Sequence, residues 1–525
     1  MYQNLYIQPV EPRDSPKLRT NYLAKPTSPD IFVSLAAPTL SAMEALAVRV
    51  AGIPVGYELR FDYLQDLTHF ESQLHQMLTR LHFPQVIATC RLAGAGGMLK
   101  GSLADQAALL TAAVRAGCQW VDLEIETIDK DGPGLLKDLR PAKLIVSYHD
   151  FQKTPALAPA YKRLVRLPVQ VIKIATHARY LRDNLQIRRL LKTHRRHTPK
   201  LVALAMGASG IPSRLLALQW GSAFTYASPL DHAPAAAGQI PAEVMRRVYR
   251  ADRLDSRAQI YGVLGSHASM SLSPAMQNAA FQAKHVNAIF LPCETSKLSD
   301  FLAFARELEI QGIAVTMPYK RAILRALDWT DPLANRIGAC NTVAVQRGRW
   351  LGWNTDAAAV VEVLMKRVRL AGSRVLILGA GGAARAAAYA VRAEGADVII
   401  AARREVAART LARGVAAQVV PWGSAEGLEV DAVINATPIG QLPHPDASPI
   451  DLARLRVRVV FDMVYFPLAT RFLNEARGRG LTTISGLEML VAQGARQFEI
   501  WTGLAAPRAL MEQAVRSALD HSTQG

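Results

Sequence analysis

The sequence predicts an α/β protein in which an N-terminal (β/α)8 barrel precedes a two-lobed unit with a dinucleotide-binding domain. Three observations lead to this prediction. The chain has 525 residues, which is too long for a single hydrophobic core. Short apolar runs alternate with longer helix-like stretches over residues 31–226. A glycine-rich turn follows another apolar run at residue 376, more than two thirds of the way along the chain.

Composition and cysteine usage narrow the class of protein. Half of the residues are hydrophobic, as in a well-buried globular protein. We find no apolar run of the roughly 18–20 residues that a membrane helix needs. Residues 1–28 lack the apolar core of a signal peptide, so we expect a flexible tail. The cysteines (Cys90, Cys118, Cys293 and Cys340) lack zinc or C-x-x-C spacing, which favours free thiols in the cytoplasm and no metal site.

A net charge of +18 raises the possibility of a nucleic-acid partner. The basic residues are dispersed, however, and the densest run, residues 188–197, has the apolar spacing of a helix with a solvated outer face. Attraction of anionic substrates explains the sign of the charge equally well. We therefore expect small-molecule substrates, and neither nucleic acid nor a membrane, as partners.

The first half contains eight strand candidates in order, the number of strands in a TIM barrel. They are "IFVSL" from 31, "VGYELR" from 55, "VIATC" from 86, "WVDLEI" from 120, "KLIVSY" from 143, "VQVIKIA" from 169, "LVALAM" from 201 and "SAFTY" from 222. Catalytic residues of such barrels lie where the strands end.

Lys173, in the sixth strand, is the most informative residue of this half. A lysine inside an apolar strand is costly if it stays charged, so it is either paired with a carboxylate or a desolvated amine that can form a Schiff base. His149, at the end of the neighbouring strand, is placed to act as a general acid and base. Several arginines near other strand ends indicate an anionic substrate.

Several motifs in this half resemble type I 3-dehydroquinate dehydratases, in the order of that family. They are "YELRFD" (57–62), "CR" (90–91), "VSYHDFQKTP" (146–155), "VIKIA" (171–175), "AMGASGIPSR" (205–214), "GSAFTY" (221–226) and "GQIP" (238–241). The resemblance implies that Lys173 forms an imine with the C3 ketone of 3-dehydroquinate, while His149 takes the C2 proton and assists loss of the C1 hydroxyl. It also implies a set of residues that bind the substrate: Glu58, Arg60, Arg91, Arg214 and Gln239.

Two positions depart from the family pattern. Ala95 stands where an acidic residue usually precedes a glycine pair, and Ala235 replaces a serine near "GQIP". Both changes remove a polar group, but neither touches the Lys173–His149 pair. We expect an active dehydratase that is weakened or closes its lid differently, and the alternative is an inactive barrel kept as a scaffold.

The second half begins after a charged helical segment, residues 244–258, that we expect to be a linker. Ser271 and Ser273 precede a helical run and could simply cap it. Lys320, taken alone, would be an unremarkable surface lysine. Together with polar residues at other strand and turn ends, it forms a set that could orient a polyhydroxylated ring, with Lys320 and Asp356 relaying a proton. The other members of the set are Asn341 and Thr342.

The stretch "SRVLILGAGGAARAAAYAVRAEGADVIIAARR", residues 373–404, reads as a strand, a glycine turn, a helix and a second strand, the order of a Rossmann βαβ unit. Its glycines allow a tight turn and close approach of backbone N–H groups to a pyrophosphate. The turn residues are Gly379, Ala380, Gly381, Gly382 and Ala384. Arg403 and Arg404 stand where an NAD site places an acidic residue, which favours NADP(H) over NAD(H).

Residues 259–525 resemble shikimate dehydrogenases in these motifs and in "INATPIG" (434–440), "VFDMVYFPLATRFL" (460–473) and "ISGLEMLVAQGARQFEIWTG" (484–503). The resemblance implies that one set of residues faces the substrate: Ser271, Ser273, Thr316, Lys320, Asn341, Asp356, Tyr465 and Gln493. It implies that a second set lies along the cofactor: Thr437, Met463 and Gly486. Ala402 stands where many relatives have an asparagine before the phosphate-binding cation.

The two resemblances concern consecutive steps of the shikimate pathway, because 3-dehydroshikimate is the product of the first and the substrate of the second. We therefore expect a bifunctional enzyme that makes shikimate with NADPH for aromatic amino acid biosynthesis. The alternatives are an aldol-cleaving barrel fused to a dehydrogenase of quinate or a related polyol, and a non-catalytic nucleic-acid binder. The expected domains are a tail (1–28), the barrel (29–243), a linker (244–258), a substrate lobe (259–356), a Rossmann domain (357–485) and C-terminal helices packed on the substrate lobe (486–525).

Overall fold

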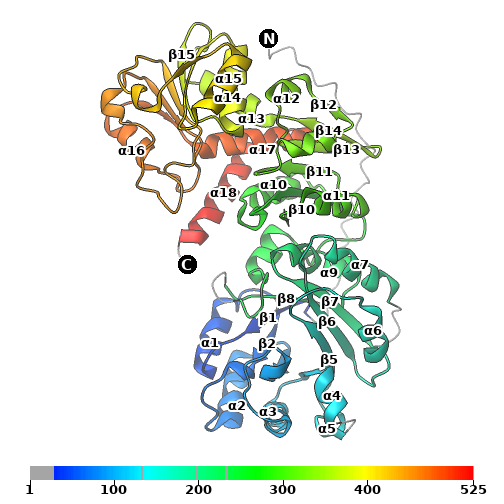
Figure 1. The fold of residues 1–525 in the computed structure, drawn as a ribbon. Helices are drawn as coiled ribbons and strands as arrows, with labels where there is room; N and C mark the ends of the chain where they lie inside the picture. Colours follow the sequence, from blue (N-terminus) through cyan, green and yellow to red (C-terminus); the bar gives the residue numbers. More distant parts are fainter. Residues whose placement is uncertain (1–28, 132–133, 195–198, 231–233, 524–525) are drawn as a thin grey trace.

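The computed structural model describes residues 29–131, 134–194, 199–230 and 234–523. The expected N-terminal tail lies outside the described residues, as do residues 195–198 of the basic run. Three α/β bodies follow one another along the chain, the barrel at one end and the Rossmann domain at the other (Figure 1).

An eight-stranded parallel sheet curls into the expected N-terminal barrel, in the order β7-β6-β5-β4-β3-β2-β1-β8. The ring is nearly closed: β7 and β8 end the order, and Ala223 N, just before β8, donates a hydrogen bond to Leu201 O in β7 over 2.8 Å. The strands are β1 (Ile31–Leu35), β2 (Gly56–Arg60), β3 (Val86–Thr89), β4 (Trp120–Glu124), β5 (Lys143–Asp150), β6 (Val171–His177), β7 (Lys200–Met206) and β8 (Thr225–Ala227).

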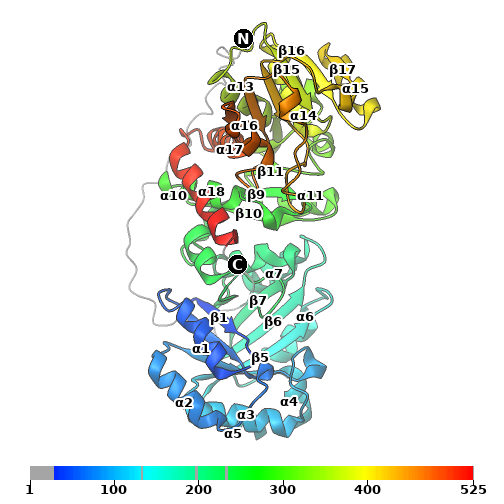
Figure 2. The same ribbon diagram turned by 90° about the vertical axis from the view of Figure 1, so that its left-hand side faces the viewer.

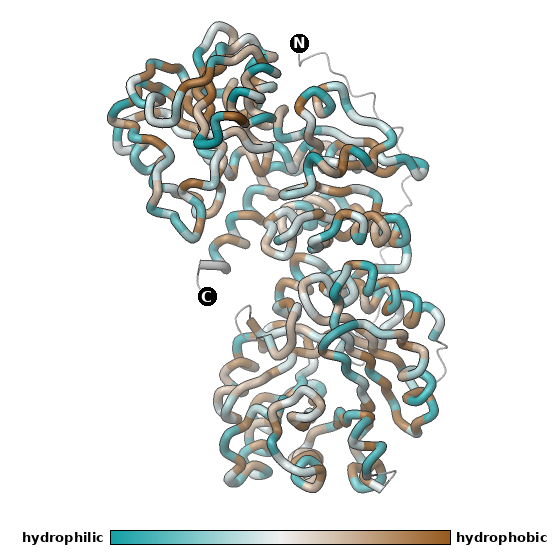
Figure 3. Tube along the Cα trace, viewed as in Figure 1, coloured by the Kyte–Doolittle hydropathy of each residue, from teal (hydrophilic) through white to brown (hydrophobic). Residues whose placement is uncertain are grey.

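Helices surround this sheet because their apolar faces cover the outward side chains of the strands. Hydrophobic and hydrophilic residues alternate along the helices, as amphipathic packing requires (Figure 3). The helices are α1 (Leu40–Arg49), α2 (Phe70–Leu81), α3 (Leu103–Ala116), α4 (Ile125–Asp131), α5 (Gly134–Asp138), α6 (Ala158–Leu164), α7 (Asp183–Thr193), α8 (Ile211–Leu215) and α9 (Ala217–Trp220).

A mixed six-stranded sheet forms the middle lobe, in the order β10-β9-β11-β13-β14-β12. The first three are parallel, and β13 runs antiparallel to its neighbours β11 and β14. The strands are β9 (Gln259–Gly265), β10 (Ala288–Glu294), β11 (Gly312–Val315), β12 (Trp329–Thr330), β13 (Thr342–Gln346) and β14 (Arg349–Trp353). The helices are α10 (Ser273–Ala283), α11 (Leu298–Glu307) and α12 (Pro332–Ile337).

A fully parallel six-stranded sheet forms the third body, in the order β17-β16-β15-β18-β19-β20. This is the 3-2-1-4-5-6 order of a Rossmann fold, with the strand before the glycine turn at the centre. Its strands are β15 (Arg374–Leu378), β16 (Asp397–Ala401), β17 (Gln418–Val420), β18 (Ala432–Asn435), β19 (Val459–Asp462) and β20 (Thr482–Ile484). Its helices are α13 (Thr355–Met365), α14 (Gly382–Ala393), α15 (Glu405–Val415) and α16 (Arg471–Gly478).

The last two helices, α17 (Gly486–Thr502) and α18 (Arg508–Thr523), return from the Rossmann sheet to the middle lobe (Figure 1). Buried side chains of α18 (Met511 and Val515) share one hydrophobic cluster with Met276 and Phe281 of α10. Among the described residues, no helix is both long enough and apolar enough to cross a membrane.

The barrel and the middle lobe adjoin each other (Figure 2). They share a continuous hydrophobic cluster. Residues 244–258, the expected linker, begin with a π-helical turn (Val244–Val248) that contacts α10. In this segment Met245, Tyr249 and Ala251 are buried members of the shared cluster. The segment is therefore packed against its surroundings, and the barrel and the lobe meet across an apolar interface.

Candidate active sites

A cavity of about 360 Å³ opens at the carboxyl ends of the barrel strands. All seven residues expected in the barrel site line it, together with others that the sequence left unassigned. The expected residues are Glu58, Arg60, Arg91, His149, Lys173, Arg214 and Gln239, and the additional ones include Ser34, Tyr63, Phe151, His177 and Tyr226.

Lys173 points into this cavity from β6 and is only 5% exposed. Its Nζ donates to Asp122 Oδ2 over 2.6 Å and to the Tyr226 hydroxyl over 3.3 Å, and it lies 4.4 Å from the centroid of the Tyr226 ring. Glu58 Oε1 is 3.6 Å away. The paired-lysine alternative is thus correct as a description of the contacts, yet the amine still faces a cavity where a ketone could reach it.

Glu58, one of the carboxylates beside Lys173, keeps its negative charge although it is buried. Burial alone would raise the pKa of Glu58, but the charges of Lys173 and Arg60 lower it to about 2. Ser34 Oγ and Thr89 Oγ1 also donate to Glu58, over 2.6 and 3.0 Å. The charge of Glu58 is therefore fixed, which lets it order nearby hydroxyl groups without changing its own protonation.

His149 lies one strand from Lys173 and two residues further toward the barrel mouth, because it pairs in register with Ala175 while Ser147 pairs with Lys173. Burial, with the charges of Arg91 and Lys173, holds the pKa of His149 well below 6.5. Its ring stacks on Phe151 with centroids 5.5 Å apart, and Nδ1 has no hydrogen-bond partner in the described part of the chain. His149 is therefore a neutral imidazole that can accept a proton at neutral pH.

The three arginines of the cavity differ in how they are neutralised. Arg60 forms two hydrogen bonds with Asp62, and Arg91 Nε donates to Glu124 over 2.8 Å. Arg214 is 1% exposed and donates only to Ala237 O over 3.3 Å, with Nε unpartnered among the residues described. Burial lowers the pKa of Arg214 to about 10, so it stays charged at neutral pH and is available to an anion.

Gln239 connects the last barrel loop to the first strand, since its Nε2 donates to Ser34 Oγ over 3.1 Å. Its Oε1 accepts from the backbone of Ala235 over 2.8 Å, so Ala235 contributes through its N–H although its side chain carries no polar group. Ala95 precedes Gly96, which lines the cavity, has φ +79° and packs against the Phe151 ring. Of the two departures from the family pattern, Ala235 lines the cavity itself and Ala95 is next to a residue that does.

No site role was expected for five residues that the structure places at this cavity or beside its lysine and arginines: Ser34, Asp122, Glu124, His177 and Tyr226. Ser34 and Asp122 occupy inward positions of β1 and β4, and the strand alternation alone could have placed them. Tyr226 stands in "GSAFTY", a motif that carried the resemblance but no role. His177 is the second inward position after Lys173 on β6.

The second site is built around Lys320, which follows β11 in the middle lobe. Its Nζ donates to Asp356 Oδ2 over 2.7 Å, and Asn341 Nδ2 donates to Asp356 Oδ1 over 2.8 Å. Asn341 also holds Thr342 and Thr355 through side-chain bonds, so the amide is fixed in one orientation. The side chain of Lys320 is 23% exposed and that of Asp356 is 9% exposed, so a buried carboxylate steadies a lysine that can reach a ligand.

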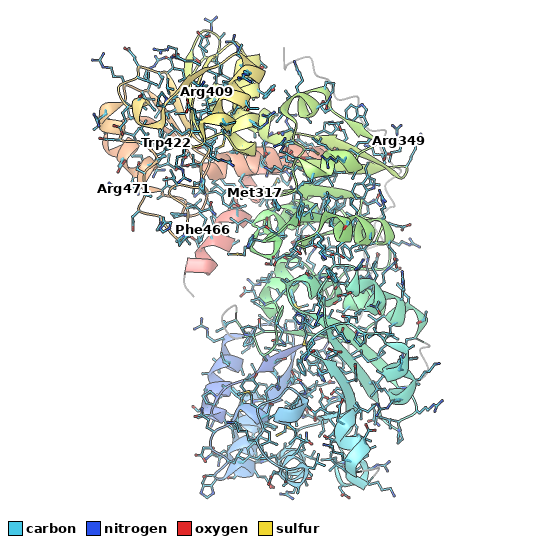
Figure 4. All side chains as sticks on the ribbon, viewed as in Figure 1. Met317, Arg349, Arg409, Trp422, Phe466 and Arg471 are labelled. Carbon is cyan, nitrogen blue, oxygen red and sulfur yellow. The ribbon has the colours of Figure 1, made fainter. Side chains whose placement is uncertain are left out.

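The other residues expected to face the substrate come from both lobes. Gln493, on α17, is 3.5 Å from Asn341 Nδ2, and the Ser271 hydroxyl accepts from Ser273 N over 3.2 Å at the start of α10. The N-cap residue of α10 is Leu272, which makes no side-chain capping bond, so neither serine takes the capping position. Thr316 lies directly before Met317 of the middle lobe, and Tyr465 lies directly before Phe466 of the Rossmann domain. Figure 4 labels Met317 and Phe466.

The glycine turn leaves room for a nucleotide at the start of α14. Gly379 has φ +114°, and a Cβ there would lie 3.0 Å from Ala436 O. A Cβ on Gly381 or Gly382 would meet nothing within 4 Å, so the backbone at the start of α14 borders open space. Helix α14 is 12 residues long, and the free N–H groups at its N-terminus fit a pyrophosphate.

The remaining cofactor residues lie along the same edge of the Rossmann sheet. Thr437, Met463 and Gly486 follow β18, β19 and β20, and a Cβ on Gly486 would lie 2.8 Å from Met463 O. Arg403 and Arg404 follow β16, are exposed, and form no ion pair within the described ranges. Ala402 precedes them and carries no polar group. The set fits a dinucleotide with an additional phosphate near β16.

Comparisons with known proteins agree with this geometry. Family models match for type I 3-dehydroquinase over residues 31–256, for the shikimate dehydrogenase substrate binding domain over 263–343 and for the shikimate 5'-dehydrogenase C-terminal domain over 486–516. A bifunctional 3-dehydroquinate dehydratase/shikimate dehydrogenase, chloroplastic, from Arabidopsis thaliana is 30% identical over 486 residues, covering 87% of this chain and 79% of the relative.

Relatives of the second half alone are also found. A shikimate dehydrogenase (NADP(+)) from Anaeromyxobacter sp. is 42% identical over 277 residues, covering 50% of this chain and 97% of the relative. The crystal structure of shikimate 5-dehydrogenase from Thermus thermophilus in complex with NADP(H) and shikimate is 39% identical, covers 50% of this chain and 100% of that chain, and has a TM-score of 0.47.

Proposed function

The chain belongs to the bifunctional 3-dehydroquinate dehydratase/shikimate dehydrogenase family, and from this premise we propose which residues carry its two reactions. The enzyme dehydrates 3-dehydroquinate to 3-dehydroshikimate and reduces that product to shikimate in an NADP-dependent step. The observation that supports the first assignment best is a buried lysine beside a neutral histidine in one cavity.

Lys173 is the nucleophile of the dehydratase. Its amine transfers a proton to Asp122, 2.6 Å away, and attacks the C3 ketone; the carbonyl oxygen leaves as water and an imine remains. The imine makes the C2 proton more acidic, and neutral His149 accepts it. His149 then returns this proton to the C1 hydroxyl, which leaves as water while a C1=C2 double bond forms. Hydrolysis of the imine frees Lys173 and the product.

Arg214 binds the substrate carboxylate, because it is a buried cation with no carboxylate partner among the described residues. Glu58, Gln239, Arg60 and Arg91 surround the ring hydroxyls, and Ser34 links Glu58 to Gln239. The Arg60–Asp62 and Arg91–Glu124 pairs are internally neutralised, so these two arginines donate hydrogen bonds rather than supply the main counter-charge.

Borohydride reduction in the presence of 3-dehydroquinate tests the Lys173 assignment. We expect a stable adduct on the peptide that contains Lys173, located by mass spectrometry, and no adduct in Lys173→Ala. His149→Ala should still form the adduct while losing turnover by about 10²–10⁴-fold, since the proton transfer is lost but the nucleophile remains. A reduced adduct on any other lysine would exclude the proposed nucleophile.

In the dehydrogenase, Lys320 donates the proton that the substrate carbonyl oxygen gains as the ketone becomes an alcohol. NADPH, when bound, supplies the hydride to the carbonyl carbon. Asp356 orients Lys320 through a hydrogen bond, and Asn341 fixes Asp356. Ser271, Ser273, Thr316, Tyr465 and Gln493 bind the ring carboxylate and hydroxyls.

The cofactor lies on the carboxyl edge of the Rossmann sheet. Gly379, Ala380, Gly381, Gly382 and Ala384 give its pyrophosphate access to the N–H groups that begin α14, and Arg403 with Arg404 binds its 2′-phosphate. Thr437, Met463 and Gly486 border the nicotinamide side.

Replacing Lys320 by Met tests the proton-donor role. We expect kcat for 3-dehydroshikimate reduction to fall by about 10²-fold or more, with KM changed much less, because the ammonium acts mainly as the reaction proceeds. The dehydratase activity of the same protein is the internal control and should be unchanged. A loss confined to KM would contradict the role.

Compartment and domain limits complete the proposal. The four cysteines are free and buried, as expected for a protein of the reducing cytoplasm. As domain limits we propose a barrel (29–243), a connecting segment (244–258), a substrate lobe (259–356), a Rossmann domain (357–485) and a C-terminal region (486–525).

A further inference from the structure

The barrel loop that carries Arg214 is fastened to the dehydrogenase half of the chain. We propose that Asp300, a residue of the middle lobe, is a positioning residue for the dehydratase, because it holds the segment that orients Arg214. The inference rests on the proposed role of Arg214 as the residue that binds the substrate carboxylate. It predicts that a residue outside the barrel sets how tightly the barrel binds 3-dehydroquinate.

Asp300 lies on α11 and is 3% exposed. Its Oδ2 accepts from Leu181 N over 2.8 Å, and its Oδ1 accepts from Arg182 N over 3.2 Å. These N–H groups directly precede α7, whose N-cap residue, Arg182, makes no capping bond with its side chain. A carboxylate from the neighbouring body therefore fills the capping role at a helix of the barrel. Thr295 Oγ1 orients the same carboxylate over 3.0 Å.

The first turn of α7 in turn holds residues 207–214, a 3-10 turn (Ala208–Gly210) and most of α8, which we call the Arg214 loop. Asn184, 0% exposed, donates to Ser209 O over 2.7 Å and accepts from Ser213 N over 3.0 Å. Ser213 is also fully buried, and its hydroxyl ties the loop to Ala205 N and Gly210 O. Arg214 is the next residue. Hydrogen bonds thus lead from Asp300 through Asn184 to Ser213, and so to the backbone that carries Arg214.

A second contact from the middle lobe reaches the same loop. The Ser209 hydroxyl donates to Glu294 O over 3.0 Å. The Glu294 carboxylate accepts from Ser269, two residues before Ser271 of the dehydrogenase site, at 3.0 Å from its backbone N. The strand end that holds the Arg214 loop is therefore also joined to a loop of the other active site.

The energetic reason for this arrangement lies in the surroundings of Arg214. A charged side chain with a single hydrogen bond to the protein has little else to fix its direction, so its placement depends on its backbone. Without Asp300, two buried N–H groups at α7 lose their acceptor, and the first turn with its attached loop is free to shift. A displaced guanidinium weakens substrate binding but leaves Lys173 and His149 in place, since these belong to β6 and β5.

The test is Asp300→Ala in the full-length chain, with steady-state kinetics of both reactions. We expect KM for 3-dehydroquinate to rise at least about fivefold while dehydratase kcat stays within about twofold, the pattern of lost uniform binding. Dehydrogenase kcat/KM within about twofold of wild type would show that the fold is kept. The matched control is Glu307→Gln, which weakens the exposed Arg189–Glu307 pair of the same interface but does not contact the Arg214 loop.

A double-mutant cycle with Arg214→Ala separates this inference from the role of Arg214. If Asp300 acts through Arg214, Asp300→Ala adds less than about a twofold increase in KM once Arg214 is absent. If Asp300→Ala raises the KM for 3-dehydroquinate equally in wild type and in Arg214→Ala, the inference is wrong. If Arg214→Ala alone leaves this KM unchanged, Arg214 does not bind the substrate carboxylate, and the proposed role of Arg214 is wrong as well. Where Asp300→Ala loses both activities, Thr295→Val decides, because it removes the hydroxyl that orients the Asp300 carboxylate: a KM raised about twofold or more supports the inference, and an unchanged KM rejects it.

Discussion

At the scale of single residues, both active sites place a lysine against a carboxylate, but the surroundings of the two pairs differ. Lys173 and Asp122 are 2.6 Å apart with side chains 6% and 0% exposed, whereas Lys320 and Asp356 are 2.7 Å apart with side chains 23% and 9% exposed. A lysine in a closed cavity must pass its proton to a neighbour before it can attack a ketone. A lysine at an open site can donate its proton and recover one from water. The exposure of each pair therefore suits covalent catalysis in one half and proton donation in the other.

The dehydratase should keep its activity in mildly acidic solution, because burial and the charges of Arg91 and Lys173 hold the pKa of His149 well below 6.5. Protonation of His149 removes the base, so the acidic limb of kcat/KM follows this pKa. In Arg91→Met the loss of a positive charge raises the pKa of His149, so dehydratase kcat/KM begins to fall at a higher pH than in wild type. Arg91→Lys keeps the charge and should leave the limb in place; a limb equally displaced in both variants would exclude the electrostatic cause. The measurement is the pH profile of dehydratase kcat/KM.

The choice between NADPH and NADH should depend on Arg403 and Arg404. Replacing both by Ala removes charged hydrogen bonds to the 2′-phosphate, and we expect KM for NADPH to rise by about tenfold or more while KM for NADH changes little. Arg409→Ala is the matched control: Arg409 lies on α15 nearby but is already paired with Glu405 (Figure 4). If the control raises KM for NADPH as much, general positive charge and not a specific phosphate site sets the preference.

At the scale of elements, the barrel strands and the Rossmann βαβ unit were predictable because each depends on local patterns. Apolar β-branched runs predicted all eight barrel strands, although β6 begins at Val171 rather than at residue 169 and β8 at Thr225 rather than at residue 222. The glycine turn was found between β15 and α14 as expected. Contacts between distant strands were less accessible: Ser34 with Glu58, and Lys173 with Asp122, depend on the register and tilt of a closed sheet. The role of Asp300 could not be predicted from the sequence, because its hydrogen-bond partners lie in another body and no local motif marks the residue.

The glycine turn itself makes a prediction that separates folding from binding. Gly379→Ala forces a side chain into φ +114° and 3.0 Å from Ala436 O, and we expect a loss of about 1–3 kcal/mol in the free energy of unfolding. Gly381→Ala has an ordinary extended backbone and open space around its Cβ, so stability should stay within about 0.5 kcal/mol. Its methyl group instead occupies the nucleotide space and should raise KM for NADPH. Thermal melts and NADPH titrations distinguish the two, and a stability loss in Gly381→Ala would contradict the open-space interpretation.

At the scale of the whole molecule, the barrel and the middle lobe meet through buried side chains as well as surface charges. The Arg189–Glu307 pair at this interface is exposed and contributes at most about 1 kcal/mol. By contrast, the apolar cluster that contains Met245 and Ala251 continues from the barrel into the sheet of the middle lobe. The packed segment after residue 243 therefore contributes more to the stability of the interface between the barrel and the middle lobe than the Arg189–Glu307 ion pair does.

Met245 gives the decisive test of that union, because it is 0% exposed within a π-helical turn that contacts α10. Met245→Ala should lower the free energy of unfolding by about 2–5 kcal/mol through the cavity it leaves. Met365→Ala makes the same change at a side chain that is 57% exposed and should cost less than about 0.5 kcal/mol. Because the cluster belongs to both bodies, the dehydratase and dehydrogenase activities of Met245→Ala should be lost at the same lowered temperature. If only one activity became heat-sensitive, Met245 would belong to the core of that body alone, and the interface would have to be held by its polar contacts.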